Sequence, residues 1–131
     1  MFFQSLQAGF EPKEVSLRAL AHLGDAVFEL FEREREILRA LSAKALHKNV
    51  VKRVNASQQA VLLAKIEALL TESESDLVRR ARNLKPASYR KIDQSVYRRS
   101  TAFEALIGYL YLTDSIRLKE LLDATVDKPE P

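Results

Sequence analysis

Residues 19–31 read ALAHLGDAVFELF, a run of helix-forming residues with a glycine and an aspartate side by side at its middle. At 100° per residue, the apolar side chains share one arc with Gly24 inside it: Leu20, Leu23, Val27, Leu30 and Phe31. Glycine inside a helix costs roughly 1 kcal/mol relative to alanine, so Gly24 indicates the close approach of a second helix. Asp25 falls at the edge of the arc, where helical spacing alone favours a solvated acid.

A second stretch, STAFEALIGYLYL at residues 100–112, is apolar nearly all the way round, which is typical of a central helix. Glu104 is its only charge. A carboxylate in such a helix must be paired, capped, metal-bound or protonated, because leaving it buried and unpaired is costly. Two interpretations stay open: a capping box between Thr101 and Glu104, or a functional carboxylate beside which Gly108 opens space for a metal or a substrate.

The composition favours a single all-α domain. The chain has 131 residues, no cysteine, three glycines and four prolines, which excludes disulfides, thiolate zinc sites and thiol catalysis and fits a reducing cytoplasm. No stretch is long and apolar enough to span a membrane. We expect one domain over residues 1–131, with its core at about 16–122 and with 1–15 and 125–131 peripheral.

Apolar spacing and capping signals predict a bundle of six or seven helices. The expected helices cover about 17–38, 43–54, 58–70, 75–83, 95–112 and 115–124. The expected N-caps are Ser16, Ser42, Asn55 or Ser57, and Thr71 with Glu74 as a capping box. Pro86 is expected to end the fourth helix, because a proline disfavours helical geometry in the residue before it.

Positive charge is concentrated in one segment. The formal net charge is +3, yet residues 78–99 hold eight basic residues and a single acid, Asp93. A second basic group lies at residues 44–53. We expect nucleic-acid phosphates to bind these two groups, and the candidate nucleic-acid-binding residues are Lys48, Lys52, Arg79, Arg80, Arg82, Asn83, Lys85, Arg98 and Arg99.

Asp25 and Glu104 can converge if their helices pack side by side. Oxygen ligands alone favour a hard ion such as Mg²⁺ or Mn²⁺, which keeps several waters and takes phosphate as a further ligand. Beside a basic segment, such a site suggests metal-assisted phosphodiester chemistry on a nucleic acid.

These stretches also carry a family resemblance. LGDAVFELF at 23–31 resembles the signature helix of ribonuclease III, and FEALIGYLYL at 103–112 resembles the second catalytic helix of that family. Three further segments resemble the short branch called mini-ribonuclease III, which lacks the double-stranded-RNA-binding domain: KALHKNVVKRVNASQQA at 44–60, VRRARN at 78–83 and YRRSTAFEALIGYLYL at 97–112. Ala81 stands where the branch usually has glycine. The similarity runs from about Ser16 to Leu122.

The resemblance implies a ribonuclease III-like helical bundle in which Asp25 and Glu104 are the catalytic carboxylates and bind the divalent ion, Mg²⁺ with Mn²⁺ as a substitute. Larger ribonuclease III enzymes have acids where this chain has Ala21 and Thr101. The short branch shares this loss, so we expect one well-defined Mg²⁺ per active site.

The resemblance further implies a cytoplasmic homodimer that hydrolyses double-stranded RNA to 5′-phosphate and 3′-hydroxyl ends. The implied substrate is the precursor of large-subunit (23S) ribosomal RNA, with a ribosomal protein as a helper. Two other classes compete: a catalytically silent RNA-binding or ribosome-associated protein with the same fold, and an all-α interaction module. The presence of both carboxylates argues against the first, and the pairing of the two motifs argues against the second.

Overall fold

The computed structural model describes residues 11–85 and 93–127, and these contain helices and no strand. Six α-helices and two short 3-10 helices follow one another in the order η2 (Pro12–Glu14), α1 (Leu17–Ile37), α2 (Ala43–Val54), α3 (Ala56–Ile66), η3 (Glu67–Leu69), α4 (Glu72–Arg82), α5 (Gln94–Thr113) and α6 (Ser115–Ala124). The prediction of an all-α bundle is confirmed.

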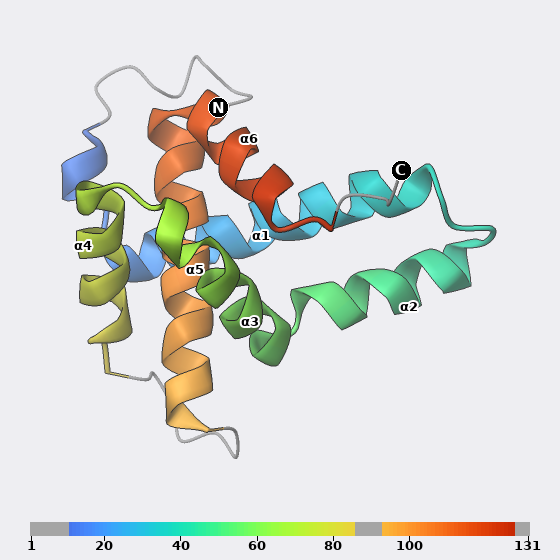
Figure 1. Ribbon diagram of the computed structural model, residues 1–131, viewed down its shortest axis with the longest axis horizontal. Helices are drawn as coiled ribbons and strands as arrows, with labels where there is room; N and C mark the ends of the chain where they lie inside the picture. The colour runs from blue at the N-terminus through green and yellow to red at the C-terminus, as the bar shows by residue number, and fades with distance from the viewer. Residues whose placement is uncertain (1–10, 86–92, 128–131) are drawn as a thin grey trace.

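Helix α5 is the centre of the bundle. It runs through the middle of the molecule, α1 crosses it, and α3, α4 and α6 surround it (Figure 1). Its most extensive contacts are with α1, followed by α3 and α4. The C-terminal part of α1 and helix α2 form a pair that extends away from the other helices (Figure 1). The near-absence of charge over residues 100–112 of α5 therefore reflects the central position of this part of the helix.

The helix starts follow the capping signals. The side chains of Ser16, Ser42 and Asn55 each accept a hydrogen bond from a backbone N–H three residues on. Thr71 and Glu74 form the predicted capping box, with both reciprocal bonds present. Helix α4 already ends at Arg82, and Pro86 lies outside the described residues.

The crossing of α1 and α5 is a contact between two backbones. A Cβ atom added to Gly24 would collide with the carbonyl oxygen of Glu104 and lie 2.9 Å from the nitrogen of Gly108. A Cβ added to Gly108 would collide with the carbonyl oxygen of Leu20. The packing interpretation of Gly24 is therefore confirmed. The expectation that Gly108 opens space beside Glu104 is wrong, because the backbone of α1 fills that space.

The buried face of α1 is rotated from the predicted arc. Leu20, Gly24 and Phe28 are buried, whereas Leu30 is 40% exposed. The Phe28 ring packs edge-on against Phe103 of α5, with 5.0 Å between the ring centroids. Because α5 crosses α1 at Gly24, the buried residues of α1 follow at intervals of four residues from Gly24. The buried face of the helix is therefore turned toward Asp25.

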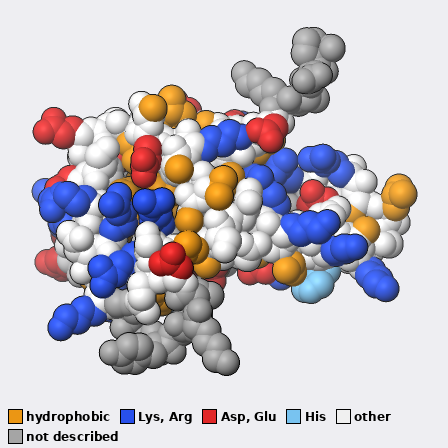
Figure 2. Space-filling model, turned by 60° about the horizontal axis from the view of Figure 1, so that its bottom comes forward, with side chains coloured by type: hydrophobic (Ala, Val, Ile, Leu, Met, Phe, Trp, Pro, Cys, Tyr) orange, Lys and Arg blue, Asp and Glu red, His pale blue; other side chains and the backbone are white. Residues whose placement is uncertain are grey.

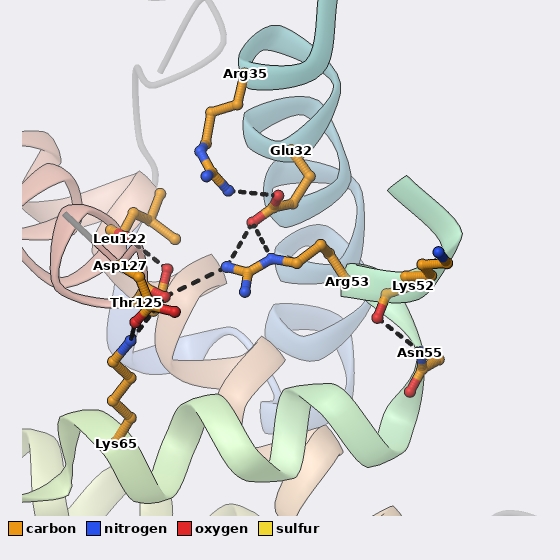
Figure 3. A network of polar contacts seen from close by, with 9 residues as sticks. All are labelled: Glu32, Arg35, Lys52, Arg53, Asn55, Lys65, Leu122, Thr125 and Asp127. Atoms are coloured by element: carbon orange, nitrogen blue, oxygen red, sulfur yellow. Dashed lines mark hydrogen bonds and ion pairs between the residues drawn. The ribbon is translucent and has the colours of Figure 1, made fainter. Parts of the chain in front are cut away.

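The same face of α1 buries a charge farther along. Glu32 has no exposed surface, and its carboxylate accepts hydrogen bonds from Arg35 at 2.8 Å and from Arg53 of α2 at 3.2 Å. Arg53 and Lys65 both donate to the carbonyl oxygen of Thr125, which follows α6 (Figure 3). This network joins α1, α2, α3 and the end of α6.

Candidate active site

Asp25 of α1 and Glu104 of α5 meet just beside the glycine crossing. Both carboxylates line one open pocket of about 390 Å³. The other lining residues come from the same two helices: Arg18, Ala21, His22, Tyr97 and Thr101. The pocket therefore brings together the two residues that the sequence predicts as catalytic, and it includes both neutral positions, Ala21 and Thr101.

Glu104 lies well inside its helix. Helix α5 begins at Gln94 with Asp93 as its N-cap, so Thr101 is not a cap and the capping-box interpretation is wrong. The Thr101 hydroxyl instead donates to the carbonyl oxygen of Tyr97 at 3.1 Å, one turn earlier. Glu104 thus has no capping function and needs another explanation.

The surroundings of Glu104 disfavour its charge. Burial raises the pKa of its carboxyl to about 9, and the neighbouring Asp25 carboxylate adds to the rise. The side chain of Gln59 acts in the opposite direction. No lysine or arginine among the described residues forms an ion pair with Asp25 or Glu104. A divalent cation would supply the missing positive charge.

The donor set fits a hard ion that keeps much of its water. Asp25 and Glu104 are the two acidic residues in the lining of the pocket, and no cluster of three or more His, Cys, Asp or Glu residues occurs within the described ranges. Mg²⁺ is commonly held by one or two carboxylates while substrate phosphate and water complete its shell. Asp25 and Glu104 match that requirement.

A second pocket, of about 280 Å³, joins the end of α4 to the start of α5. Its lining contains four of the predicted RNA-binding residues, namely Arg82, Asn83, Arg98 and Arg99, together with Gln94 and Ser95. Arg98 and Arg99 precede Glu104 on the same helix. This basic pocket therefore belongs to the helix that carries the catalytic candidate.

The remaining RNA-binding candidates are more scattered. Arg79 and Arg80 are exposed and both form ion pairs with Asp76, at 2.5 and 3.0 Å. Lys48 and Lys52 are exposed on α2. In Figure 2, lysine and arginine side chains gather at two ends of the face shown, one of them formed by the α1–α2 pair. The basic residues Arg90 and Lys91 lie outside the described residues.

Sequence reasoning missed Arg18 as a site residue. It lines the pocket of Asp25 and Glu104, and its guanidinium donates to the carbonyl oxygen of Lys85 at 2.5 Å. This bond ties the start of α1 to the chain that follows α4. The available signal was spacing, because Arg18 precedes Asp25 by two helical turns and so lies on the same side of α1.

Comparisons with known proteins agree with this geometry. Residues 18–115 match the family model described as Ribonuclease III domain. The chain is 46% identical over 110 residues to the Mini-ribonuclease 3 of Gloeobacter violaceus, covering 84% of this chain and 82% of the relative. It is 38% identical over 117 residues to the Mini-ribonuclease 3 of Streptococcus pneumoniae, covering 86% and 91%.

A solved structure shows the same architecture. The crystal structure of a protein from Fusobacterium nucleatum superimposes with a TM-score of 0.76 at 32% identity, covering 84% of this chain and 90% of that one.

Proposed function

The chain belongs to the ribonuclease III family and is an endoribonuclease, and we propose that it cleaves double-stranded RNA at the pocket lined by Asp25 and Glu104. The observation that carries this proposal is the convergence of two carboxylates that lie 79 positions apart in the sequence, with no cation of the described residues paired to either. The proposed nuclease is a single domain with its core at about residues 16–122.

Asp25 and Glu104 would hold a divalent ion, Mg²⁺ or in its place Mn²⁺. Such an ion polarises the scissile phosphate and activates water when it is bound. The protein's own residues position the substrate: the backbone contact at Gly24 and Gly108 fixes the two helices, and Arg18 lies in the pocket beside the carboxylates. The products would carry 5′-phosphate and 3′-hydroxyl ends.

The basic pocket supports binding of an RNA duplex. A-form RNA is held through its phosphates and 2′-hydroxyls more than through its bases, and Arg82, Arg98 and Arg99 offer cations that form no ion pair with an acid among the described residues. We expect affinity to fall steeply with salt, because phosphate contacts release counterions.

We propose a homodimer in which each subunit cuts one strand. In support, large apolar side chains remain exposed on α1 and just after it: Leu30, Ile37, Leu38 and Leu41. We assign these exposed side chains to the dimer contact. The proposed substrate is precursor 23S ribosomal RNA in the cytoplasm, with a ribosomal protein as a helper. No helix in the described part of the chain is long and apolar enough to cross a membrane.

The test is Asp25→Asn in the purified protein. We expect it to abolish Mg²⁺-dependent cleavage of a long RNA duplex while folding, seen by circular dichroism, and dimerisation, seen by light scattering, stay as in the wild type. Asp123→Asn changes an exposed acid on α6 in the same way and should leave cleavage unchanged. Undiminished cleavage by Asp25→Asn, after contaminating nuclease is excluded, would refute the site.

The competing proposal is a catalytically silent RNA-binding protein. It predicts binding of duplex RNA that neither Mg²⁺ nor chelator converts into cleavage. Precursor ribosomal RNA should be among the duplexes tried, because an enzyme that cleaves only a few substrates would otherwise show no cleavage and be taken for a catalytically silent protein.

A further inference from the structure

Gln59 of α3 has a buried side-chain amide in which the oxygen, but not the nitrogen, has a hydrogen-bond partner. Its side chain is 2% exposed, and its Oε1 accepts a hydrogen bond from the hydroxyl of Ser100 on α5. Its Nε2 is also buried but has no hydrogen-bond partner among the described residues. Buried polar atoms are rarely left without a partner, so the amide nitrogen requires an explanation.

Burying an unsatisfied donor is unfavourable. A lost hydrogen bond of this kind costs roughly 1–3 kcal/mol, and an apolar side chain of similar size would avoid the cost. Gln59 is therefore a poor choice for packing alone.

The side chains of Gln59 and Glu104 interact. Ser100 and Glu104 are one turn apart on α5 and so share a face of that helix. The Gln59 side chain also favours the ionised form of Glu104, as an N–H donor does. The opposite amide orientation would place two oxygens against each other, since Oε1 would then approach a carboxylate.

Gln59 belongs to the protein interior. It does not line the pocket that contains Asp25 and Glu104, and its burial keeps it away from solvent. It can therefore reach neither RNA nor a metal ion in the pocket directly, and any effect on either must act through Glu104.

We propose that Gln59, held in place by the Ser100 hydroxyl, is a positioning residue that donates from Nε2 to the Glu104 carboxylate and orients that carboxylate toward the pocket for metal binding. This inference rests on the proposed function, because it takes Glu104 to be a metal ligand. Residues that orient metal ligands in this way commonly change metal affinity by 10–100-fold when removed. The inference also explains why a glutamine near the start of α3 and a serine of α5 occur together.

The experiment compares Gln59→Met with wild type. Methionine keeps the length and shape of the side chain but cannot donate. We expect the Mg²⁺ concentration for half-maximal cleavage to rise about 10-fold. Mg²⁺ binding without RNA, measured by isothermal titration calorimetry and by the Mg²⁺-dependent rise in melting temperature, should weaken by the same factor. Gln58→Met alters the preceding, less buried glutamine of α3 and should leave all three quantities unchanged.

Ser100→Ala is the second variant, and it tests the inference even if Gln59→Met does not fold. Alanine suits a helix interior, and the change removes the bond that holds the Gln59 amide. We expect a smaller loss of Mg²⁺ affinity, about 3-fold, with cleavage at saturating Mg²⁺ close to wild type.

The outcomes separate the inference from the function on which it rests. Wild-type Mg²⁺ dependence in a folded Gln59→Met protein overturns the inference, as does wild-type dependence in Ser100→Ala if Gln59→Met does not fold. A lower melting temperature with unchanged Mg²⁺ dependence would make Gln59 a structural residue only and also overturn it. If Glu104→Gln keeps wild-type Mg²⁺ binding and cleavage, the proposed function itself fails and the inference with it.

Discussion

Helix α1 carries two carboxylates two turns apart, and their surroundings are opposite. Glu32 is fully buried and accepts hydrogen bonds from Arg35 and Arg53 (Figure 3), whereas Asp25 lies beside Glu104 with no cation of the described residues paired to either. A buried charge is tolerated only where it is compensated. The Glu32 cluster therefore holds helices together. The pair of Asp25 and Glu104 lacks a positive charge, which a bound ligand can supply.

A third carboxylate sharpens the contrast. Glu74 is buried near the start of α4, and its hydrogen bond from Arg117 holds its pKa below the usual range. Glu104 has no such partner, and its pKa moves the other way. Within one small bundle, a compensated carboxylate thus marks structure and an uncompensated one marks a candidate site.

Glu104→Gln should have the largest effect, a loss of cleavage without a loss of stability. We expect Mg²⁺-dependent cleavage to fall by at least about 10³-fold, which corresponds to roughly 4 kcal/mol of transition-state stabilisation. Stability in chelator should not fall, because the amide is neutral, as is the protonated Glu104 carboxyl at pH values below its pKa of about 9. Cleavage rates and thermal melts on the same sample measure both; a destabilised variant would place Glu104 with the structural carboxylates instead.

Glu32→Gln should show the reverse pattern. Removing this charge leaves Arg35 and Arg53 partly buried and unpaired, so we expect a loss of roughly 2–4 kcal/mol in the free energy of unfolding. Cleavage per folded molecule should stay near the wild-type value. Urea unfolding gives the stability. Glu29→Gln is the control, since its ion pair with Arg33 is exposed and worth about 0.5 kcal/mol.

The pH dependence of stability should distinguish Glu104 from Glu74. Glu104 has a folded-state pKa of about 9, above its unfolded value, so the folded protein holds a proton that the unfolded chain has lost. Its contribution is complete below about pH 4.5 and is lost as the pH rises toward 9, by at most about 1.4 kcal/mol per pH unit. Glu74, with a lowered pKa, contributes fully above pH 4.5 and loses its contribution only in acid.

Urea unfolding in chelator at several pH values between 5 and 9 measures this dependence. The wild type should lose stability across the window, and Glu104→Gln should lose less. Parallel curves for the two proteins would contradict the assignment of the shift to Glu104.

Arg98→Ala should have the smallest effect. We expect binding of duplex RNA to weaken severalfold and the slope of log affinity against log salt to fall by about 1, as for the loss of one phosphate contact. Filter binding at several salt concentrations measures both. Arg33→Ala, on the exposed side of α1, should change neither, and an equal effect of the two substitutions would argue against a localised RNA surface.

Local signals predicted much of the fold. Ser16, Ser42 and Thr71 begin their helices as expected, because a cap depends on residues three positions away. The pairing of Asp25 with Glu104 was likewise predicted, from two motifs, and the structure places both residues on one pocket.

What the sequence could not predict depends on partners that are distant in the chain. Leu30 belongs to the apolar arc but is exposed, because the direction from which α5 approaches α1 is not encoded locally. Glu32 resembles any surface acid until Arg53 of α2 is placed against it. The interaction of Gln59 with Glu104 similarly requires the packing of α3 on α5.

The contact between Gly24 and Gly108 has a consequence for how this protein can change over evolutionary time. Because main chain touches main chain at the crossing, the spacing of α1 and α5 at this point does not depend on the size of any side chain between them. Substitutions elsewhere in the core can alter its volume while the distance between the two carboxylate-bearing turns stays the same. Substitutions in most of the molecule therefore leave the geometry of the candidate site unchanged, whereas substitutions at Gly24 or Gly108 would alter it.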